Sequence, residues 1–451
     1  MKILITGATG AIGNSVGRKL FELGHELFVV SRSKSKAELY LEFPAEIIEV
    51  DLSQSLIHDS CMDNIDAVIH LMGETIDGRW TAEKKQLILE SRTKSSQNLI
   101  QSLKPRTQVV VSASAQGFYG DQGRLELSET ALKGTDFLAD VCEEWEKPFR
   151  TLDEIRSVQL RIGLVLDPQS GALKKMIPLF QKGLGGVLGS GEQYMSWIAL
   201  DDLTNVVVEA TLNHHYNGPL NCSANSVTNR EWTVKLCQSL GVFKSLPVPQ
   251  VALKLILGEM SSLVLSSIRM SNEKLRDLGF NFKYTNIDQY FFDNLNDFKD
   301  GHSVLLVRQY VPFSLNKVFP FFAEAKNLER ITPDLLHFRI EKMSTPEIQK
   351  GTLIDYNLKI HGFPAKWKTL IEDWQPPVQF VDTQLKGPYK LWHHTHSFAQ
   401  MGKGTLLTDK VRFKLPLGFL GHAVAQTFVQ KDVESIFKYR REVMSEVKFS
   451  E

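Results

Sequence analysis

A glycine-rich loop directly after a short apolar run is the feature of this 451-residue chain that most restricts its fold. The apolar run is Ile3-Leu4-Ile5, and residues 6–13 then read Thr-Gly-Ala-Thr-Gly-Ala-Ile-Gly. A strand, a tight turn and a helix start in this order bring free N–H groups and the positive end of a helix dipole to one point, which suits a phosphate. We therefore predict a dinucleotide site; the alternative is a tight turn that binds no ligand.

The three glycines of this loop have separate expected roles. Gly7 permits the tight turn, Gly10 lets the backbone approach a pyrophosphate, and Gly13 lets the helix pack closely on the strand. Thr9 and Ile12 lie between them and are expected to border the cofactor as well.

The next apolar run, residues 26–30, ends in Ser31-Arg32. An enzyme that uses NAD usually has an acidic residue here for the ribose 2′-hydroxyl. The guanidinium of Arg32 can instead pair with a 2′-phosphate, so we predict NADP (NADPH) as the cofactor and count Ser31 and Arg32 among its contacts. The alternative is a solvated surface arginine in a loop that also carries Lys34 and Lys36.

Composition excludes several classes of protein. Basic and acidic residues balance at 52 each, which argues against a nucleic-acid or anionic-membrane partner. The four cysteines show no paired close spacing, so we expect neither disulfides nor a zinc site of cysteines, and a cytoplasmic location. No apolar stretch reaches the roughly 18 residues of a membrane span.

Short β-branched runs alternate with helical patterns up to about residue 222, which predicts an α/β Rossmann domain with a doubly wound parallel sheet. Residues 228–298 become helical, and Thr228 begins a capping pattern. We expect residues 1–298 to form this first domain. The expected strands after the glycine loop are 46–50, 67–71, 108–112 and 158–162.

The pattern of predicted strands and helices changes after residue 301, and we expect residues 302–451 to form a second, α+β domain. A long amphipathic pattern over about 423–447 closes it. Before that pattern we expect a helix over 314–323 and strands over 303–310, 353–360, 367–374, 379–385, 392–398 and 405–413.

Several separate motifs of the first domain match one family. They are Trp80 with Ser91-Arg92, Ser112 to Ala115 leading to Phe118-Tyr119-Gly120, Asp140-Val141-Cys142 leading to Trp145-Glu146, Arg161-Ile162-Gly163, and Gly189-Ser190-Gly191 leading to Trp197-Ile198. With the G-x-x-G-x-x-G spacing, residues 1–297 resemble the atypical extended short-chain dehydrogenase/reductases, in the branch of NAD-dependent epimerase-like proteins named nucleoside-diphosphate-sugar epimerases. The resemblance implies further cofactor contacts from Asp51, Leu52, Leu71, Gly73, Arg92 and Ser112.

The same resemblance implies a catalytic Ser or Thr, a Tyr and a Lys, but these positions fall on Ala115, Leu138 and Cys142. Neither Leu nor Ala can carry a proton. Cys142 could be a reactive thiol or a small buried hydrophobe.

Three accounts of the chemistry stay open. Other groups could catalyse, with Ser114, Tyr119 and Asp140 as candidates, alongside Ser112 and Glu74; the alternatives are a packing role for Tyr119 and a solvated helix face for Asp140. A hydride could pass to a bound acceptor, such as a flavin or quinone, that takes the proton itself. The domain could also sense the nucleotide without turnover.

Motifs of the second domain resemble the START-like, or SRPBCC, helix-grip fold of polyketide cyclases and coenzyme Q-binding proteins. They are residues 327–333, Gly387-Pro388-Tyr389 and residues 392–396. The resemblance implies a cavity for an apolar small molecule. We expect its lining to draw on Trp367, Trp374, Trp392, Phe413 and Phe428.

A histidine cluster, His393, His394 and His396, lies in this second domain. On a strand only His394 and His396 share a face, and no carboxylate completes a ligand set. We expect cavity-lining or surface histidines without a metal; a metal site is the alternative.

Together these features favour an NADP-dependent oxidoreductase or epimerase-like enzyme of undetermined small-molecule substrate, with a fused domain that binds an apolar ligand. The rival is a non-catalytic binding protein in which the nucleotide regulates ligand capture. The oligomeric state does not follow from the sequence.

Overall fold

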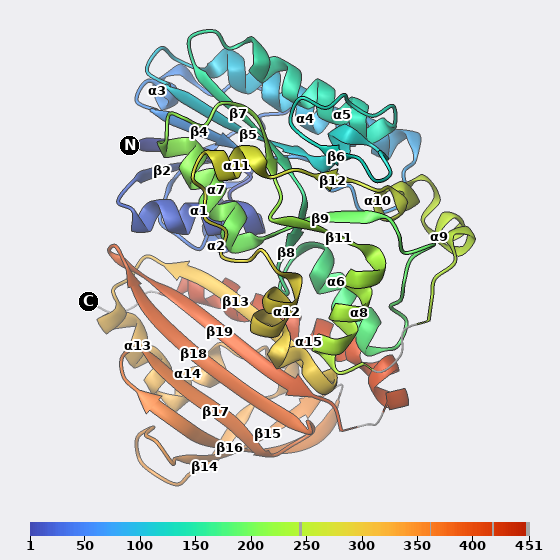
Figure 1. The fold of residues 1–451 in the computed structure, drawn as a ribbon. Helices are drawn as coiled ribbons and strands as arrows, with labels where there is room; N and C mark the ends of the chain where they lie inside the picture. The colour runs from blue at the N-terminus through green and yellow to red at the C-terminus, as the bar shows by residue number, and fades with distance from the viewer. Residues whose placement is uncertain (243–245, 361, 417–418, 448–451) are drawn as a thin grey trace. The chain divides into compact units, whose positions relative to one another are not determined.

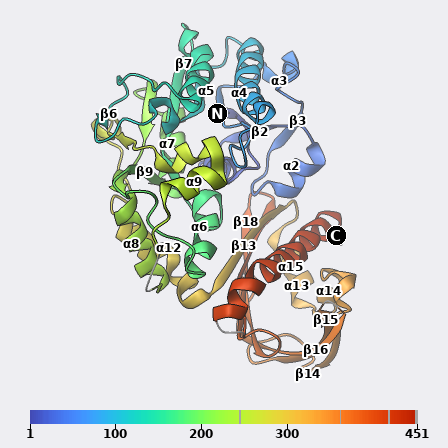
Figure 2. The same ribbon diagram turned by 90° about the vertical axis from the view of Figure 1, so that its right-hand side faces the viewer.

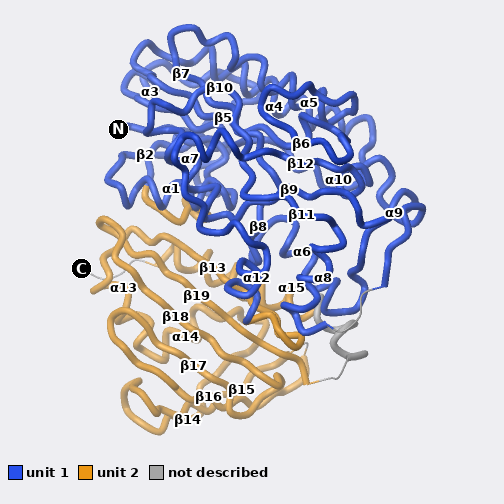
Figure 3. Tube along the Cα trace, in the orientation of Figure 1, with its two compact units in different colours: residues 1–37, 45–296 blue, residues 38–44, 297–451 orange. Residues whose placement is uncertain are grey.

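The computed structural model describes residues 1–242, 246–360, 362–416 and 419–447, with the side chains of 419–427 left aside. The chain divides into two compact units (Figure 3). The first comprises Met1–Ala37 and Ala45–Asn296, and the second comprises Glu38–Pro44 and Asp297–Glu451. A short stretch near the N-terminus therefore groups with the second unit.

A seven-stranded parallel sheet forms the centre of the first unit. Its strands are β1 (Lys2–Thr6), β2 (Glu26–Ser31), β3 (Glu46–Glu49), β4 (Ala67–His70), β5 (Val109–Ala115), β7 (Arg156–Ile162) and β10 (Gly218–Cys222). They lie in the order β10-β7-β5-β4-β1-β2-β3, and every pair is parallel. The order reverses between β1 and β4, and the carboxyl ends of strands at such a point are where open α/β sheets bind ligands.

Helices cover both faces of this sheet, which is why its strands are continuous apolar runs. They are α1 (Ala11–Glu22), α3 (Asp59–Met62), α4 (Ala82–Ser102), α5 (Phe137–Glu146) and α7 (Leu200–Leu212). Helix α2 (Lys34–Tyr40) follows β2 in the chain, and α6 (Gly171–Gln181) packs instead on residues 164–166 and 229–240. Helices α1 and α7 pack together on one face, and α4 and α5 cover the other (Figure 1). Ile3, Leu4 and Ile5 are fully buried between them. The predicted parallel Rossmann-like fold is confirmed.

Two small sheets and a helical part complete the first unit. One sheet has the order β11-β9-β8 and the other pairs β12 with β6, with bounds β6 (Glu126–Leu127), β8 (Leu164–Leu166), β9 (Tyr194–Ala199), β11 (Asn225–Thr228) and β12 (Arg269–Met270). The helices are α8 (Asn229–Leu240), α9 (Gln250–Leu257), α10 (Ser262–Leu265), α11 (Glu273–Asp277) and α12 (Ile287–Leu295). Thr228 caps α8 by accepting a hydrogen bond from the Glu231 N–H at 3.2 Å, as its capping pattern predicts.

The second unit is a seven-stranded antiparallel sheet with helices. Its elements are β13 (Ser303–Val311), α13 (Leu315–Ala323), α14 (Ala325–Arg330), β14 (Arg339–Met343), β15 (Leu353–Ile360), β16 (Phe363–Gln375), β17 (Gln379–Lys386), β18 (Leu391–Met401), β19 (Gly404–Lys414) and α15 (Phe419–Glu446). The strand order is β13-β19-β18-β17-β16-β15-β14, and α15 lies over one face (Figure 2). Strand β14 was not predicted, and β16 begins four residues before the strand predicted over 367–374.

Alternation of side chains shows which face of this sheet is covered. Along β19, the residues Leu407, Asp409, Val411 and Phe413 are buried in turn, and the residues between them are more exposed. Val433 and Phe437 of α15 pack on this buried face with Leu305. A charged residue, Asp409, therefore stands in an otherwise apolar stripe.

No helix in the portion of the chain that the structure describes combines the length and the apolar character needed to cross a bilayer.

Candidate functional site

The glycine loop connects β1 to α1, and two of its glycines lie directly against neighbouring backbone. Gly7 has φ +70°, and a Cβ there would stand 2.9 Å from the backbone of Leu71. A Cβ on Gly13 would stand 2.5 Å from the Gly7 carbonyl oxygen. These two glycines therefore serve the packing of strand, loop and helix, and neither tolerates a side chain.

Gly10 is different, because its surroundings are open. A Cβ there would meet the Gly7 carbonyl oxygen at 3.3 Å and, its two chain neighbours aside, no other atom of the described residues within 4 Å. Gly10 is also the N-cap of the 12-residue helix α1, and no side chain caps that helix. Thr9 beside it is exposed and Ile12 is half-buried. Space, free N–H groups and the helix dipole therefore meet where a pyrophosphate would bind.

The loop after β2 holds the candidate 2′-phosphate contact. The Ser31 hydroxyl donates to the carbonyl oxygen of Ser33 at 3.0 Å, which folds the loop into a turn. Arg32 is exposed, and its guanidinium has no hydrogen bond or ion pair among the described residues. Asp51 accepts hydrogen bonds from the N–H and hydroxyl of Ser53, at 3.0 and 2.6 Å.

Leu52, next to Asp51, is fully buried in the core. Its side chain therefore packs inside the domain, and only its backbone remains for a cofactor contact.

The carboxyl ends of β1 and β4 are joined by buried hydrogen bonds. Thr6 Oγ1 lies 2.9 Å from His70 Nδ1 and accepts from the Leu71 N–H at 3.2 Å. The hydroxyls of Ser95 and Ser96 approach His70 Nε2 at 3.3 and 3.4 Å. Burial lowers the pKa of His70 to about 3, so the imidazole is neutral. This network holds the glycine loop against the Leu71 backbone.

Arg92 of α4 lies beside Gly73, where β4 leads into its loop. A Cβ on Gly73 would stand 3.1 Å from the Arg92 Cζ, and the guanidinium stacks on Trp145 at 4.8 Å. Its Nη1 donates to the Ile88 carbonyl at 2.9 Å, and burial lowers the pKa of Arg92. Arg92 therefore lies close to the expected cofactor position, with part of its guanidinium already engaged by Ile88 and Trp145.

The three positions on which the expected triad falls do lie together. The Cys142 Sγ is 3.7 Å from the Ala115 carbonyl oxygen, and a Cβ on Gly117 would meet both Leu138 and Cys142. Burial raises the pKa of the Cys142 thiol to about 12. At neutral pH none of these side chains can exchange a proton with a substrate.

Ser114 and Tyr119, two of the predicted catalytic residues, are held in a buried polar network. The Ser114 hydroxyl donates to Glu146 Oε1 at 2.6 Å, and Glu146 forms a two-point ion pair with Arg161 at 2.9 and 3.0 Å. The Tyr119 hydroxyl donates to Asn221 Oδ1 at 2.6 Å and accepts from Arg161 at 3.0 Å. The structure thus places neither hydroxyl where it faces an open site.

Burial also raises the pKa of Tyr119 to about 12, although Arg161 acts in the opposite direction. For Glu146, burial raises the pKa, but the hydrogen bond and charge of Arg161 outweigh it and hold the pKa below its usual range. The network is therefore a stable ion pair that ties β5, α5 and β7 together.

Each of the remaining candidates already contacts another protein group. Asp140 is exposed on α5 and pairs with Lys133. Ser112 is buried, with a long contact of 3.5 Å to the Val158 carbonyl. Glu74 pairs with Lys84 at 2.7 Å near Gly73. The geometry of the first unit is therefore that of a nucleotide site without the expected acid and base.

The second unit contains a cavity of about 320 Å³. Of the residues expected to line it, Trp367, Trp392 and Phe428 do so. Trp374 instead packs against Phe319 and Phe380. Phe413 is fully buried in a separate cluster with Val411 and Val433. Both rings lie on the same face of the sheet as the cavity, since Phe413 stands opposite Trp392 and Trp374 stands opposite Phe380, but neither borders the cavity itself.

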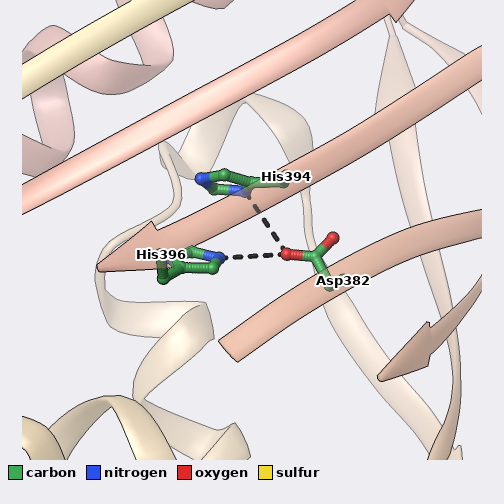
Figure 4. Close-up of side chains that lie close together, drawn as sticks. All are labelled: Asp382, His394 and His396. Carbon is green, nitrogen blue, oxygen red and sulfur yellow. Dashed lines mark hydrogen bonds and ion pairs between the residues drawn. The ribbon is translucent and has the colours of Figure 1, made fainter. Parts of the chain in front are cut away.

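A charged cluster lines part of this cavity (Figure 4). Asp382 Oδ2 lies 3.0 Å from His396 Nε2 and 3.4 Å from His394 Nδ1. Asp409 Oδ1 lies 2.9 Å from both His394 Nε2 and His396 Nδ1, and 2.8 Å from Arg440 Nη1. His396 Nδ1 is nevertheless a buried atom without a hydrogen bond, because the angle of its contact is unfavourable.

The expectation that no carboxylate accompanies these histidines was wrong. Neighbouring strands supply two: Asp382 of β17 pairs with His394 of β18, and Asp409 of β19 pairs with His396. His393 points to the other face, 4.0 Å from Glu372. These carboxylates could have been found from the sequence by looking for a polar residue at an inward position of an apolar strand, as Asp409 is.

Protonation differs between the two imidazoles. Burial, together with the neighbouring His396, lowers the pKa of His394 to about 4. Burial lowers the pKa of His396 too, but the hydrogen bond to Asp382 and the charge of Asp409 outweigh it and raise that pKa.

Comparison with known proteins shows which family the first unit resembles. Residues 3–221 match the NAD dependent epimerase/dehydratase family, and residues 248–291 match a domain of unknown function, DUF1731. The chain is 38% identical over 295 residues to the epimerase family protein SDR39U1 homolog, chloroplastic, of Arabidopsis thaliana, which covers 63% of this chain and 84% of that protein. It is 32% identical over 299 residues to the epimerase family protein YfhF of Bacillus subtilis, with 64% and 96% covered.

Among solved structures, human epimerase family protein SDR39U1 (isoform 2), crystallised with NADPH, is 26% identical with a TM-score of 0.59. The match covers 65% of this chain and 99% of that one.

Proposed function

The chain belongs to the NAD dependent epimerase/dehydratase family, and from this premise we propose that it is an NADP-dependent oxidoreductase or epimerase-like enzyme acting on a small molecule. The observation that carries the choice of NADP is Arg32. It is an exposed guanidinium without a partner among the described residues, at the end of β2, and Ser31 and Ser33 flank it in place of an acid. The NADPH bound to human SDR39U1 supports this choice.

The residues of the glycine loop fit the pyrophosphate, and Arg32 fits the 2′-phosphate. The space beside Gly10 and the uncapped start of α1 would receive the diphosphate, and Asp51, Leu71, Gly73 and Arg92 would border the ribose and adenine. Bound NADPH would supply a hydride.

The chemistry we favour needs no proton from the usual triad. Ala115, Leu138 and the buried thiol of Cys142 offer a closed, apolar wall beside the cofactor position. Such a wall excludes water and suits an acceptor, of the flavin or quinone kind, that takes its own proton. The same wall supports the second candidate, a nucleotide sensor without turnover.

For the second unit, we propose a START-like helix-grip domain that holds an apolar ligand. The antiparallel sheet, the long helix α15 and the 320 Å³ cavity with aromatic walls support this reading. A domain that holds such a ligand in the same chain would present or store the substrate of the first unit.

Calorimetric titration of the full chain with NADPH and NADH tests the cofactor choice. We expect NADPH to bind at least about tenfold more tightly, which corresponds to about 1.4 kcal/mol. Arg32→Ala should remove this preference, with Lys34→Ala as the matched control in the same loop. Equal affinities in the natural chain would contradict the proposal.

Turnover is tested by NADPH oxidation with a panel of quinones, enones and nucleotide sugars. Oxidation that depends on one acceptor class supports the enzyme. If NADPH binds and changes the affinity of a fluorescent fatty acid or quinone analogue, yet no acceptor is reduced, the sensor is the better account. Trp367 and Trp392 in the cavity wall provide the fluorescence signal for that measurement.

A further inference from the structure

The geometry of the second unit points to a function that the proposed enzyme does not require. We propose that Asp382, His394 and His396 bind one divalent transition-metal ion, of the zinc or iron(II) class, in the wall of the cavity. Two imidazoles and a carboxylate are the donors that such ions prefer.

The three donor atoms are already gathered. One ligand atom from each of Asp382, His394 and His396 lies within 4.8 Å of the others. Two of the separations are 3.0 and 3.4 Å. Ligands at about 2.1 Å from one ion stand about 3.0 to 3.4 Å apart, for right-angled and tetrahedral arrangements respectively. These two separations therefore already match those of ligand pairs on one ion; the two rings, whose centroids are 3.7 Å apart and whose planes differ by 37°, would have to turn for both lone pairs to point at it.

The outer contacts of both imidazoles fit the same site. An imidazole that binds a metal usually directs its second nitrogen, as N–H, to a carboxylate. Here His394 Nε2 and His396 Nδ1 both approach Asp409 Oδ1 at 2.9 Å. Arg440, itself buried, pairs with Asp409 at 2.8 Å and balances its charge. One carboxylate would thus orient both ligands.

Hydrogen-bond counting supports an ion between the three donors. Four nitrogen–oxygen contacts join the two imidazoles to Asp382 and Asp409, and each needs an N–H to be favourable. Two neutral rings carry two N–H groups, so two contacts would place a lone pair against a carboxylate. With a cation at Asp382, both lone pairs face the ion and both N–H groups face Asp409.

The cluster as it stands is also incompletely satisfied. His396 Nδ1 is buried and makes no hydrogen bond, although Asp409 is close. A buried polar atom without a partner is unfavourable, and ligation at Nε2 would allow the ring to turn toward Asp409. The rival account places an additional proton on one ring in place of the ion, which supplies an N–H to three of the four contacts.

Three protein ligands leave open positions on the ion, as in catalytic and not structural sites. Because all three line the cavity, those positions face its apolar interior. The ligand class that fits is an apolar molecule with one oxygen donor, such as a carbonyl, enolate or carboxylate, which would bind the ion directly.

The test uses the full chain after treatment with a chelator. Calorimetry with Zn²⁺ should show one ion per chain, and Co²⁺ should give visible ligand-field bands upon binding. Asp382→Asn and His394→Gln should each weaken Zn²⁺ binding at least about a hundredfold, since each removes a ligand. Asp409→Asn should weaken it about 10 to 100-fold without abolishing it, because Asp409 acts through the imidazoles.

Two controls separate this site from incidental binding. His393→Gln lies on the same strand but faces away, and it should bind as the natural chain does. His214→Gln alters an exposed pair of histidines elsewhere and should also have no effect. Melting temperatures establish that each variant is folded. Absence of stoichiometric Zn²⁺ binding, unchanged binding in both Asp382→Asn and His394→Gln, or loss only in His214→Gln would overturn the proposal.

Discussion

Replacing His70 should change how the stability of the first unit depends on pH. His70 is fully buried, and burial lowers its pKa to about 3 from 6.5. Between these values the unfolded chain binds a proton that the folded chain does not, so stability is complete above pH 6.5 and is lost as the pH falls. From about pH 7.5 to about pH 4.5 the loss due to this one group is about 2.5 kcal/mol.

His70→Gln removes this titration but keeps a polar side chain near Thr6, Ser95 and Ser96. At about pH 7.5 the variant should be less stable than the natural chain. Between about pH 7.5 and about pH 4.5 the natural chain should lose about 2.5 kcal/mol of stability that the variant keeps, so the difference in their free energies of unfolding changes by that amount in favour of the variant. Because two units can unfold separately, we would follow urea-dependent hydrogen exchange in peptides from β1 and β4, which report the first unit. A difference that stays constant across this pH range would contradict a buried, neutral His70.

Three further outcomes are expected. Gly10→Val should abolish NADPH binding measured by calorimetry and leave the circular dichroism spectrum unchanged, because its side chain would fill open space at the loop; retained binding would place the phosphate elsewhere. Tyr119→Phe should lower the free energy of unfolding by about 1–3 kcal/mol and leave NADPH affinity unchanged. Glu146→Gln should lower it by about 3–5 kcal/mol, since Arg161 keeps a buried charge without its partner; a smaller loss than for Tyr119→Phe would contradict the network.

The fold of the first unit could be predicted because its signals are local. Apolar runs, a glycine loop and helix caps each lie within a few residues, and all agree on parallel strands alternating with helices. Strand β14 was missed because it is an edge strand whose residues are mostly exposed, so the alternation that identifies a half-buried strand is weak there.

The two candidate sites were harder to predict because their partners are distant in the chain. Tyr119 meets Asn221 across 102 positions, and Ser114 meets Glu146 across 32. Asp382 reaches His396 only through the register of β17 against β18. Local sequence identifies residue types that can do chemistry, but tertiary pairing decides whether their polar atoms are already occupied.

Helix α15 has a consequence for the order in which the second unit can form. It follows all the strands along the chain, yet Val433 and Phe437 cover the inner face of the sheet. The first and last strands, β13 and β19, are also neighbours. During synthesis, β13 cannot pair with β19, and α15 cannot cover the inner face of the sheet, until these later segments have been made. Until then apolar surface and Asp409 face solvent. We therefore expect the second unit to complete its folding only after α15 has been synthesised.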